Sequence, residues 1–357
     1  MMNIGFYIPQ LFGGGAERVV TSLSNTLAQL GHNVTVITTV RHKDDYLLED
    51  GVKRYVLDEM ALSRWGILNK CIRFKRLRTI CREERLDVLI AFLSGAVNYS
   101  VLACLGLKTR VVVSERNSPE FTYQSQFGRI WAKIIFSLSD GVVFQTRDAQ
   151  AWFPKFVQRK SIVIPNPVKE IYYSVPYNPQ PKRVVSVGRL TEQKNYPLLI
   201  AAFASVVKVV PDAQLHIYGG GHLRMQLQDF IYQNGLGGNI HLKGTTNDIP
   251  GVLSEASVFV MSSDVEGMPN ALMEAMTVGV PCVSTDCPCG GPHFLLSGGR
   301  GLLVPVGDVS CLAEKILVLL QSDELCDEYS LKSKAYMQQF RQEEITSKWL
   351  DFISSLQ

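Results

Sequence analysis

The hydrophobic pattern of the chain alternates between short, continuous apolar runs and longer amphipathic segments. Its start predicts a strand at Asn3 to Ile8, a helix from about Glu17 to Leu30 that Gly31 ends, and a strand at Asn33 to Thr39. Further apolar runs predict strands at Val88 to Phe92, Val111 to Ser114, Gly141 to Gln145 and Ser161 to Ile164. Runs rich in Val and Ile are typical of parallel strands covered on both faces, so we expect an α/β, doubly wound sheet.

A proline-rich, polar stretch from about Pro165 to Pro181 interrupts this pattern, as an interdomain linker would. A second α/β pattern follows. Its predicted strands are Arg183 to Val187, Gln214 to Tyr218, Asn239 to Leu242, Val258 to Met261 and Pro281 to Ser284, with helices near Tyr196 to Val209, His222 to Asn234 and Pro269 to Val278. We expect two Rossmann-like domains, 1–170 and 180–338, which face one another across a deep cleft. The amphipathic segment at about 340–357 could pack back on the first domain.

Composition excludes several classes of protein. The chain has 357 residues, 46% hydrophobic content and a net charge of +3, which suits two medium-sized folded domains rather than disorder or a fibre. It has no apolar run of about 18 residues and no basic-then-apolar leader, so we expect a cytoplasmic protein. Its eight cysteines lack a repeated spacing, which favours reduced thiols over a disulfide framework.

A group of possible zinc ligands lies near the end of the second pattern. Cys282, Cys287, Cys289 and His293 fall within a dozen residues, but their spacing matches no zinc motif, and prolines before and among them mark a looping segment. We therefore expect no metal site and no cofactor.

Two carboxylates offer the first candidate chemistry. Glu266 precedes a predicted helix that opens at Pro269 and Asn270, and Glu274 lies about one turn inside it. The first N–H groups of that helix lack intrahelical partners and suit an anion. Carboxylates bind sugar hydroxyls but repel phosphate, so a sugar nucleotide bound here would need cations from elsewhere.

Those cations could come from the loop that follows the strand at Arg183 to Val187. Arg189 and Lys194 stand there, at the carboxyl end where open α/β sheets bind ligands. Both could instead be solvated surface charges, and two glutamates at this spacing also occur by chance. Gly219 and Gly220 follow another strand and would let the chain pass close to a nucleotide, or form a plain turn.

Six sequence motifs, taken in order, resemble those of the GT-B glycosyltransferases of the large retaining family 4. They are Gly13-Gly-Gly-Ala-Glu-Arg, Ser114-Glu-Arg-Asn, Val163-Ile-Pro-Asn-Pro-Val, Val187-Gly-Arg-Leu-Thr-Glu-Gln-Lys-Asn, the segment from Glu266 to Glu274, and Gly301-Leu-Leu-Val-Pro-Val-Gly-Asp. The chain most resembles members that extend lipid-linked oligosaccharides for bacterial O-antigen, capsule or glycoprotein glycans, including N-acetylgalactosaminyltransferases.

The resemblance implies a role for each matching residue in the second domain. Arg189 and Lys194 would hold the donor diphosphate, Glu266 would contact the donor sugar near the reacting carbon, and Glu274 would bind the ribose. Met268, Pro269 and Asn270 would present backbone groups to the sugar and phosphates, with Gly219 and Gly220 close to the nucleotide. A nearby loop, Pro288-Cys-Gly-Gly-Pro-His-Phe, departs from the family pattern, which leaves its sugar contacts unassigned.

In the first domain the resemblance places Gly14 and Gly15 close to the phosphates or the acceptor, although a tight turn would also explain them. The acceptor-side candidates are Glu17, Glu115, Arg116 and Asn117. Many relatives carry His where Arg116 stands, and an arginine cannot act as a base there.

The segment from Arg64 to Arg82 interleaves basic residues with Trp65, Leu68 and other apolar side chains. Such a stretch could lie on an anionic membrane surface, or it could be a helix packed on the sheet with a solvated basic edge. A lipid-pyrophosphate-linked acceptor favours the first interpretation and a location on the inner face of the cytoplasmic membrane.

The prediction is a retaining, metal-independent glycosyltransferase that moves a hexose or N-acetylhexosamine from a UDP-sugar to a lipid-linked oligosaccharide, with no nucleic acid partner. Two alternatives stay open: a UDP-N-acetylglucosamine 2-epimerase-like enzyme, and a non-catalytic, membrane-associated protein that binds sugar nucleotides. A Rossmann dehydrogenase is disfavoured because the first loop lacks Gly-x-Gly-x-x-Gly and no acidic residue ends the next strand.

Overall fold

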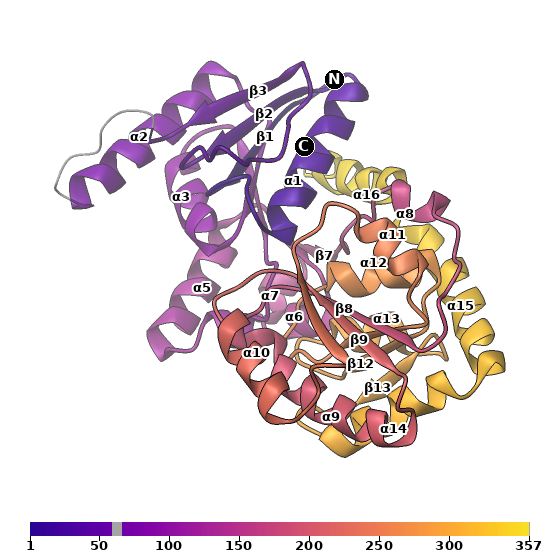
Figure 1. Cartoon of the computed structure of the whole chain (residues 1–357). Helices are drawn as coiled ribbons and strands as arrows, with labels where there is room; N and C mark the ends of the chain where they lie inside the picture. The colour runs from indigo at the N-terminus through magenta and orange to yellow at the C-terminus, as the bar shows by residue number, and fades with distance from the viewer. Residues whose placement is uncertain (59–65, 357) are drawn as a thin grey trace. The chain divides into compact units, whose positions relative to one another are not determined.

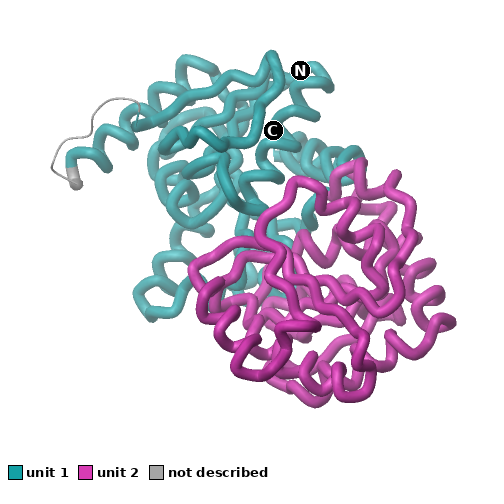
Figure 2. The backbone as a smooth tube through the Cα atoms, in the orientation of Figure 1, with its two compact units in different colours: residues 1–167, 342–357 teal, residues 168–341 magenta. Residues whose placement is uncertain are grey.

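The computed structural model describes residues 1–58 and 66–356, and divides them into two compact units. Unit 1 contains residues 1–167 together with the C-terminal segment that begins at Gln342, and unit 2 contains residues 168–341 (Figure 2). The chain therefore leaves unit 1 after Pro167 and returns to it for its last helix. Arg64 and Trp65, at the start of the basic segment, lie outside the described residues.

Unit 1 is built on a parallel sheet with the strand order β3-β2-β1-β4-β5-β6-β7 in its described part. The strands are β1 (Asn3–Ile8), β2 (Asn33–Thr38), β3 (Val52–Val56), β4 (Val88–Phe92), β5 (Arg110–Ser114), β6 (Gly141–Phe144) and β7 (Ser161–Val163). The helices are α1 (Gly15–Gln29), α2 (Gly66–Glu83), α3 (Ser94–Cys104), α4 (Pro119–Thr122), α5 (Gln126–Leu138), α6 (Arg147–Ala151), α7 (Lys155–Gln158) and α16 (Gln342–Ser354).

The strand order fixes which face of the sheet each helix covers. Because crossovers between parallel strands are right-handed, α1 lies on one face, whereas α2, α3 and α5 lie on the other. The packing agrees: α3 contacts both α2 and α5, and these helices follow one another along one side of unit 1 (Figure 1). On the opposite face α16 packs beside α1, where Ile345, Trp349 and Ile353 are buried.

Unit 2 repeats the architecture with the strand order β10-β9-β8-β11-β12-β13. Its strands are β8 (Arg183–Val187), β9 (Gln214–Tyr218), β10 (Ile240–Gly244), β11 (Val258–Met261), β12 (Cys282–Thr285) and β13 (Leu302–Val304). Its helices are α8 (Ile171–Ser174), η1 (Glu192–Lys194), α9 (Tyr196–Val209), α10 (Arg224–Gln233), α11 (Ile249–Ser254), α12 (Asn270–Val278), α13 (Gly291–Leu296), α14 (Val309–Leu320), α15 (Asp323–Met337) and η2 (Gln338–Phe340).

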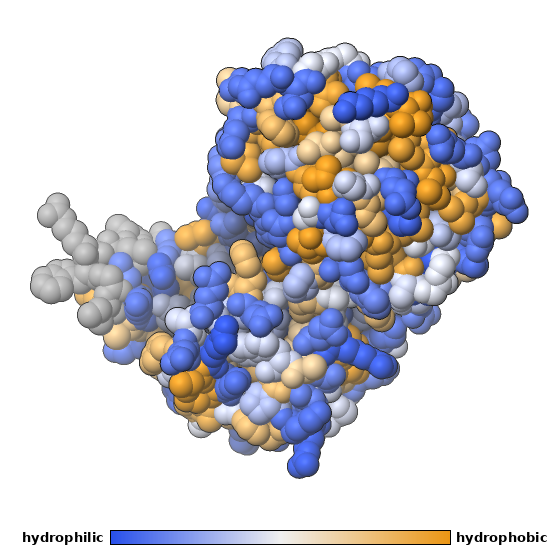
Figure 3. Space-filling model, turned by 90° about the horizontal axis from the view of Figure 1, so that it is seen from below, coloured by the Kyte–Doolittle hydropathy of each residue, from blue (hydrophilic) through white to orange (hydrophobic). Residues whose placement is uncertain are grey.

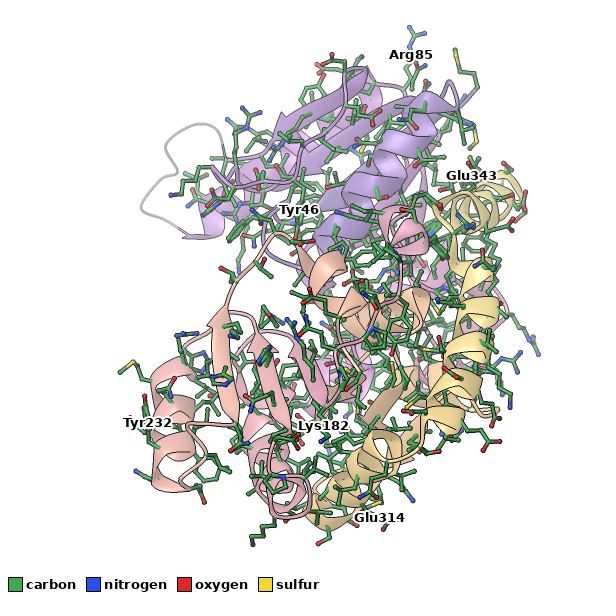
Figure 4. All side chains as sticks on the ribbon, turned by 45° about the vertical axis from the view of Figure 1, so that its right-hand side comes forward. Tyr46, Arg85, Lys182, Tyr232, Glu314 and Glu343 are labelled. Atoms are coloured by element: carbon green, nitrogen blue, oxygen red, sulfur yellow. The ribbon has the colours of Figure 1, made fainter. Side chains whose placement is uncertain are left out.

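The core of unit 2 lies between the sheet and the layer of α9, α10 and α14. Phe203 on α9, Ile217 on β9 and Ile316 on α14 are among its fully buried members. On the outer side of the helices, charged residues such as Glu314 on α14 are exposed, as is Glu343 on α16 in unit 1, and their side chains can be followed in Figure 4.

These features confirm the predicted fold class, two Rossmann-like domains with parallel, doubly wound sheets. Two short strands, β3 and β13, were not predicted. β3 is an edge strand in which Lys53 and Arg54 interrupt the apolar pattern, and β13 has three residues, too few to show a period. Among the described residues, no helix combines the length and the apolar character needed to cross a membrane.

Candidate functional site

The candidate site of unit 2 forms where two neighbouring strands end. β8 and β11 pair in parallel, so the loops that follow them leave the same edge of the sheet side by side. This arrangement brings Lys194 and Glu266, 72 positions apart, into contact: Nζ of Lys194 lies 2.5 Å from Oε1 of Glu266. Ser263 donates a second hydrogen bond to the same oxygen, at 2.7 Å. The side chains of Lys194 and Glu266 are only 16% and 9% exposed.

Hydrogen bonds between the two loops hold this pair in place. Asn195 adopts a left-handed conformation, with φ of 43°, and caps α9, while its Nδ2 donates to Asp264 Oδ1 at 2.8 Å. Gln193 Nε2 donates to the carbonyl of Val265 at 2.7 Å, and Ser262 Oγ donates to the carbonyl of Lys194 at 2.9 Å. The ion pair therefore sits on a scaffold of two loops that these hydrogen bonds join to one another.

A third loop, after β12, closes on Glu266 from another side. The N–H of Glu266 donates to the carbonyl of Pro288, and the N–H of Cys289 donates to the carbonyl of Glu266. A side chain at Gly291 could not fit, because its Cβ would lie 1.8 Å from the carbonyl oxygen of Gly267. Burial and the nearby Glu266 carboxylate raise the pKa of Cys287 to about 12, so this thiol is neutral at physiological pH.

Glu274 and the start of α12 lie directly after this loop. Pro269 is the N-cap in an extended conformation, α12 begins at Asn270, and Glu274 is buried on the helix. Met268 is buried as well, whereas Asn270 is partly exposed. The predicted helix start is thus correct, and it places the N–H groups of the first turn beside the loop that carries Glu266.

The structure does not pair Arg189 with the other candidates. Its side chain is exposed and, within the described residues, has neither a hydrogen bond nor an ion pair. It stands five positions before Lys194 in the same loop. The loop therefore carries one cation already paired with a carboxylate and one that faces solvent.

Gly219 and Gly221 are required by contact between two loops. A Cβ on Gly219, whose φ is +144°, would lie 1.9 Å from the carbonyl oxygen of Gly188, and one on Gly221 would lie 2.2 Å from that of Leu190. The N–H of Leu190 also donates to the carbonyl of Gly220 at 2.9 Å. Since the first of these loops leads into η1, this close packing supports the position of Lys194.

In unit 1 the first glycine loop is covered by a carboxylate. Gly14 is the N-cap of α1 and Gly15 its first residue. A Cβ on Gly14 would lie 1.9 Å from Oε2 of Glu17, which is buried in the first turn of the helix. The glycine thus makes room for the Glu17 side chain. The negative charge of Glu17 is stabilised there by the positive end of the α1 dipole.

The second candidate group of unit 1 follows β5. Glu115 accepts hydrogen bonds from the N–H groups of Arg116, at 3.0 Å, and Asn117, at 3.1 Å, and from the hydroxyl of Tyr123 at 2.9 Å. Burial raises the pKa of Glu115 above its usual range, and these donors oppose the shift.

Arg116 points into the core of unit 1. Its guanidinium lies 4.5 Å from the ring centre of Phe92 and 5.5 Å from that of Trp349, and donates to Asn166 Oδ1 at 3.0 Å. Burial lowers the pKa of Arg116 to about 9, which still leaves it charged at neutral pH. Its contacts therefore join the carboxyl ends of β4 and β5 to α16. An acceptor-side role for Glu17, Glu115, Arg116 and Asn117 stays a prediction.

The cysteine and histidine candidates do not assemble. Cys282 Sγ contacts the carbonyl of Val280, Cys287 lies beside Glu266, and His293 is exposed with Nδ1 3.1 Å from Asp286. In the described parts of the chain, no group of three or more His, Cys, Asp or Glu side chains has the geometry to hold a metal ion.

Sequence reasoning missed several residues that build these sites. Ser263 lies three positions before Glu266, but it belongs to no recognisable motif. The sequence predicted Trp349 only as an apolar residue of the last helix. Asn195 did have a signal, because an Asn before Tyr-Pro at a helix start is typical of an N-cap.

Comparison with known proteins gives two adjoining family matches. Residues 13–170 match the model described as Glycosyltransferase Family 4, and residues 170–336 match the model described as Glycosyl transferases group 1. Together the two matches span residues 13–336.

Curated relatives match along most of the chain. One is an alpha-1,4-N-acetyl-D-galactosaminyltransferase of Campylobacter jejuni, named for the glycan GalNAc-alpha-(1->4)-GalNAc-alpha-(1->3)-diNAcBac-PP-undecaprenol; it is 27% identical over 362 residues, covering 100% of this chain and 99% of the relative. Another is the O-antigen biosynthesis glycosyltransferase WbnH of Escherichia coli, 29% identical over 321 residues, or 85% of this chain and 86% of the relative.

The crystal structure of Anabaena HepE in complex with UDP-glucose superposes with a TM-score of 0.86 at 20% identity. The match covers 99% of this chain and 100% of that one. The likeness shows that the two proteins share a fold, GT-B.

Proposed function

The chain belongs to the glycosyltransferases of family 4 and group 1, and from this premise we propose that it moves a hexose or N-acetylhexosamine from a UDP-sugar to a lipid-linked oligosaccharide. The family membership confirms the resemblance seen in the motifs. The names of the Campylobacter and Escherichia coli relatives, a transferase named for a PP-undecaprenol-linked glycan and an O-antigen enzyme, support the acceptor class. The UDP-glucose bound by the Anabaena protein supports the donor class.

The observation that carries the proposal is the Lys194–Glu266 pair on its rigid scaffold. A lysine ammonium has three N–H donors, of which Glu266 uses one, so Lys194 can also bind a diphosphate oxygen. The Glu266 carboxylate, held by Lys194 and Ser263 through one oxygen, can use the other for sugar hydroxyls. The exposed Arg189 supplies the second positive charge that a diphosphate needs.

Glu274 and the start of α12 complete the proposed donor site. Glu274 binds the ribose hydroxyls, and the backbone of Met268, Pro269 and Asn270, at the positive end of α12, faces the sugar and phosphates. Gly219 and Gly220 bring the backbone close to the nucleotide. The site then pairs carboxylates with hydroxyls and cations with phosphates, which is the charge pattern of a sugar nucleotide.

In the proposed reaction the new bond forms on the face from which the old one leaves. The bond between the sugar C1 and the diphosphate oxygen breaks, its electron pair stays on UDP, and the acceptor hydroxyl oxygen bonds to C1. The acceptor proton passes to the departing diphosphate. Lys194 and Arg189 neutralise the charge that grows on UDP, the electrostatic stabilisation on which such transfers depend, so the proposed reaction needs no metal ion.

A transfer assay tests this function. The full-length protein is incubated with UDP-glucose, UDP-galactose, UDP-N-acetylglucosamine or UDP-N-acetylgalactosamine and a synthetic polyprenyl-diphosphate oligosaccharide. We expect one donor to extend the acceptor by one sugar, with an α linkage seen by NMR and no loss of rate in EDTA. Glu266→Gln should lower kcat by about 10²–10³-fold, the effect of removing one stabilising group.

Glu314→Gln provides the matched control, since it removes an exposed carboxylate on α14 and should keep the wild-type rate. The proposal would be refuted if none of the four donors extended the acceptor. Conversion of UDP-N-acetylglucosamine without an acceptor would identify an epimerase instead. A Glu266→Gln variant with the wild-type transfer rate would show that the site is wrongly assigned.

A further inference from the structure

The basic helix that the sequence singled out for a membrane surface is packed into unit 1. The apolar side chains Leu77, Ile80 and Cys81 of α2 are buried. Three of its arginines have partners within the unit: Arg73 forms an ion pair with Asp58, Arg76 donates to the carbonyl of Leu57, and Arg78 donates to the carbonyls of Ala103 and Leu105. The described part of α2 thus exposes three basic residues, Lys70, Lys75 and Arg82, which we call its basic edge, and one large apolar side chain, Leu68, at 50% exposure.

A different helix, α5, exposes a stripe of large apolar side chains. The stripe consists of Phe127, Ile130, Trp131, Ile134 and Leu138, which are 76%, 60%, 38%, 44% and 49% exposed. Their spacing of three or four positions aligns them along one face of the helix. The opposite face carries Ala132, Ile135 and Phe136, which pack into the core. The helix is therefore apolar on two sides, and only one of them is used within the described fold.

Single exposed apolar residues are common on proteins, and Figure 3 shows apolar areas interrupted by hydrophilic residues on one face of the molecule. On α5, five exposed apolar side chains follow one face of a single helix. Two are aromatic and stack on one another, with the rings of Phe127 and Trp131 6.4 Å apart and 8° from parallel. Trp131 also donates from Nε1 to Asn98 on α3, so its indole is held at the surface in one orientation. A contiguous apolar surface of this kind marks an interaction site.

The charges around the stripe indicate the kind of partner. α5 contains Arg129 and Lys133 and no acidic residue. Beyond α3, in the same helical layer, lies α2 with its exposed Lys70, Lys75 and Arg82 (Figure 1). An apolar stripe with aromatic residues, bordered by positive charge, matches the apolar and anionic layers of a lipid surface. Two copies of the same face would instead bring Arg129 and Lys133 against their own counterparts without a compensating carboxylate on the helix.

We propose that the stripe of α5 docks unit 1 onto an anionic lipid bilayer, with the stripe inserted at the interface and the basic edge of α2 on the headgroups. This inference does not depend on the donor site of unit 2. It assigns the apolar contact to α5 and leaves α2 a long-range electrostatic role. Anionic lipid should therefore be needed for capture of the protein, and the apolar stripe for its retention at high salt.

Vesicle flotation tests the proposal. The probes are vesicles of phosphatidylcholine alone, and of equal amounts of phosphatidylcholine and phosphatidylglycerol. We expect the wild type to float with the mixed vesicles, and the triple variant Phe127→Gln, Ile130→Gln, Ile134→Gln to bind at least tenfold more weakly. Trp131 is left intact because it supports the packing on α3.

The control variant, Met225→Gln, Tyr232→Gln and Leu331→Gln, removes three large side chains of α10 and α15 that are 73%, 68% and 71% exposed, and should bind like the wild type. Circular dichroism confirms that each variant is folded, and with wild-type donor hydrolysis or transfer retained, any defect is confined to docking. Equal flotation of the triple variant and the wild type would overturn the proposal. A stripe-dependent dimer, seen by light scattering, together with unchanged vesicle binding would assign the stripe to a second copy of the chain instead.

Discussion

Disrupting the Lys194–Glu266 pair from both sides gives the most informative perturbation of unit 2. Glu266→Gln keeps the shape and the hydrogen bond from Ser263 but removes the negative charge, which leaves the Lys194 ammonium uncompensated at 16% exposure. Lys194→Met does the reverse and leaves the carboxylate, at 9% exposure, without its cation. Because these side chains are mostly shielded from water, neither charge can be solvated without moving the loops.

Removing one partner of a buried pair costs about 3–5 kcal/mol, and the residual exposure places this pair near about 3 kcal/mol. In a unit of this size that loss lowers the melting temperature by about 6–12 °C. The double variant leaves no unpaired charge, so its loss should be smaller than the sum of the single losses by about 1–3 kcal/mol.

Calorimetry and circular dichroism are the appropriate assays for this cycle. All four tryptophans of the chain lie in the segments of unit 1, so tryptophan fluorescence would report on the other unit. If the two single losses add to within about 0.5 kcal/mol, the side chains do not interact in solution and the reasoning about this site is refuted.

Three further predictions concern packing and pH. Gly219→Ala should destabilise unit 2 by about 1–3 kcal/mol, because its Cβ would overlap the carbonyl of Gly188, whereas Gly238→Ala has open space and should be neutral; equal melting temperatures would contradict this. Burial lowers the pKa of His216 to about 4 in the folded protein. As the pH falls from about 6.5 to 4, the unfolded chain therefore binds a proton at His216 that the folded protein does not, and the free energy of unfolding should decrease. His216→Gln should flatten that decline, and parallel stability–pH curves would exclude the effect. In urea unfolding, Trp349→Ala should lower the free energy of unfolding of unit 1 by about 3–5 kcal/mol, and Trp349→Phe by less than about 1.5 kcal/mol. Similar losses for the two variants would mean that packing of the ring is unimportant.

The sheets were predictable because their strands are continuous apolar runs. The Val-rich or Ile-rich strands β4, β8 and β11 have the predicted bounds, and so does β9, in which buried Leu215 and Ile217 alternate with polar residues. The helix start at Pro269 and Asn270 also followed from local chemistry. Edge strand β3 was not predictable in this way, since a strand with one neighbour can carry Lys53 and Arg54.

The contacts within the sites were harder to predict than the elements. Lys194 and Glu266 were both candidates, but their contact depends on β8 and β11 being neighbours in the sheet, which no local pattern records. Arg116 was expected on the acceptor side by its motif, whereas its burial between Phe92 and Trp349 depends on the return of the last helix to unit 1.

The apolar stripe of α5 was hidden for a different reason. Both sides of this helix are apolar, so the pattern alone does not reveal which side is buried. The sequence instead indicated the basic segment of α2 as the membrane-binding candidate, because a run of charges can be recognised in a sequence whereas solvent exposure cannot.

The most direct test of the donor site is the dissociation constant of UDP-sugar, measured by isothermal titration calorimetry on folded, full-length protein. Lys194→Met should weaken binding at least tenfold, because a charged hydrogen bond to the diphosphate contributes about 1.5–3 kcal/mol. Lys182→Met, which removes an exposed lysine paired with Asp212 before β8, should leave the constant unchanged (Figure 4). Equal affinity of the wild type and Lys194→Met for the donor would contradict the central claim that this lysine binds the nucleotide sugar.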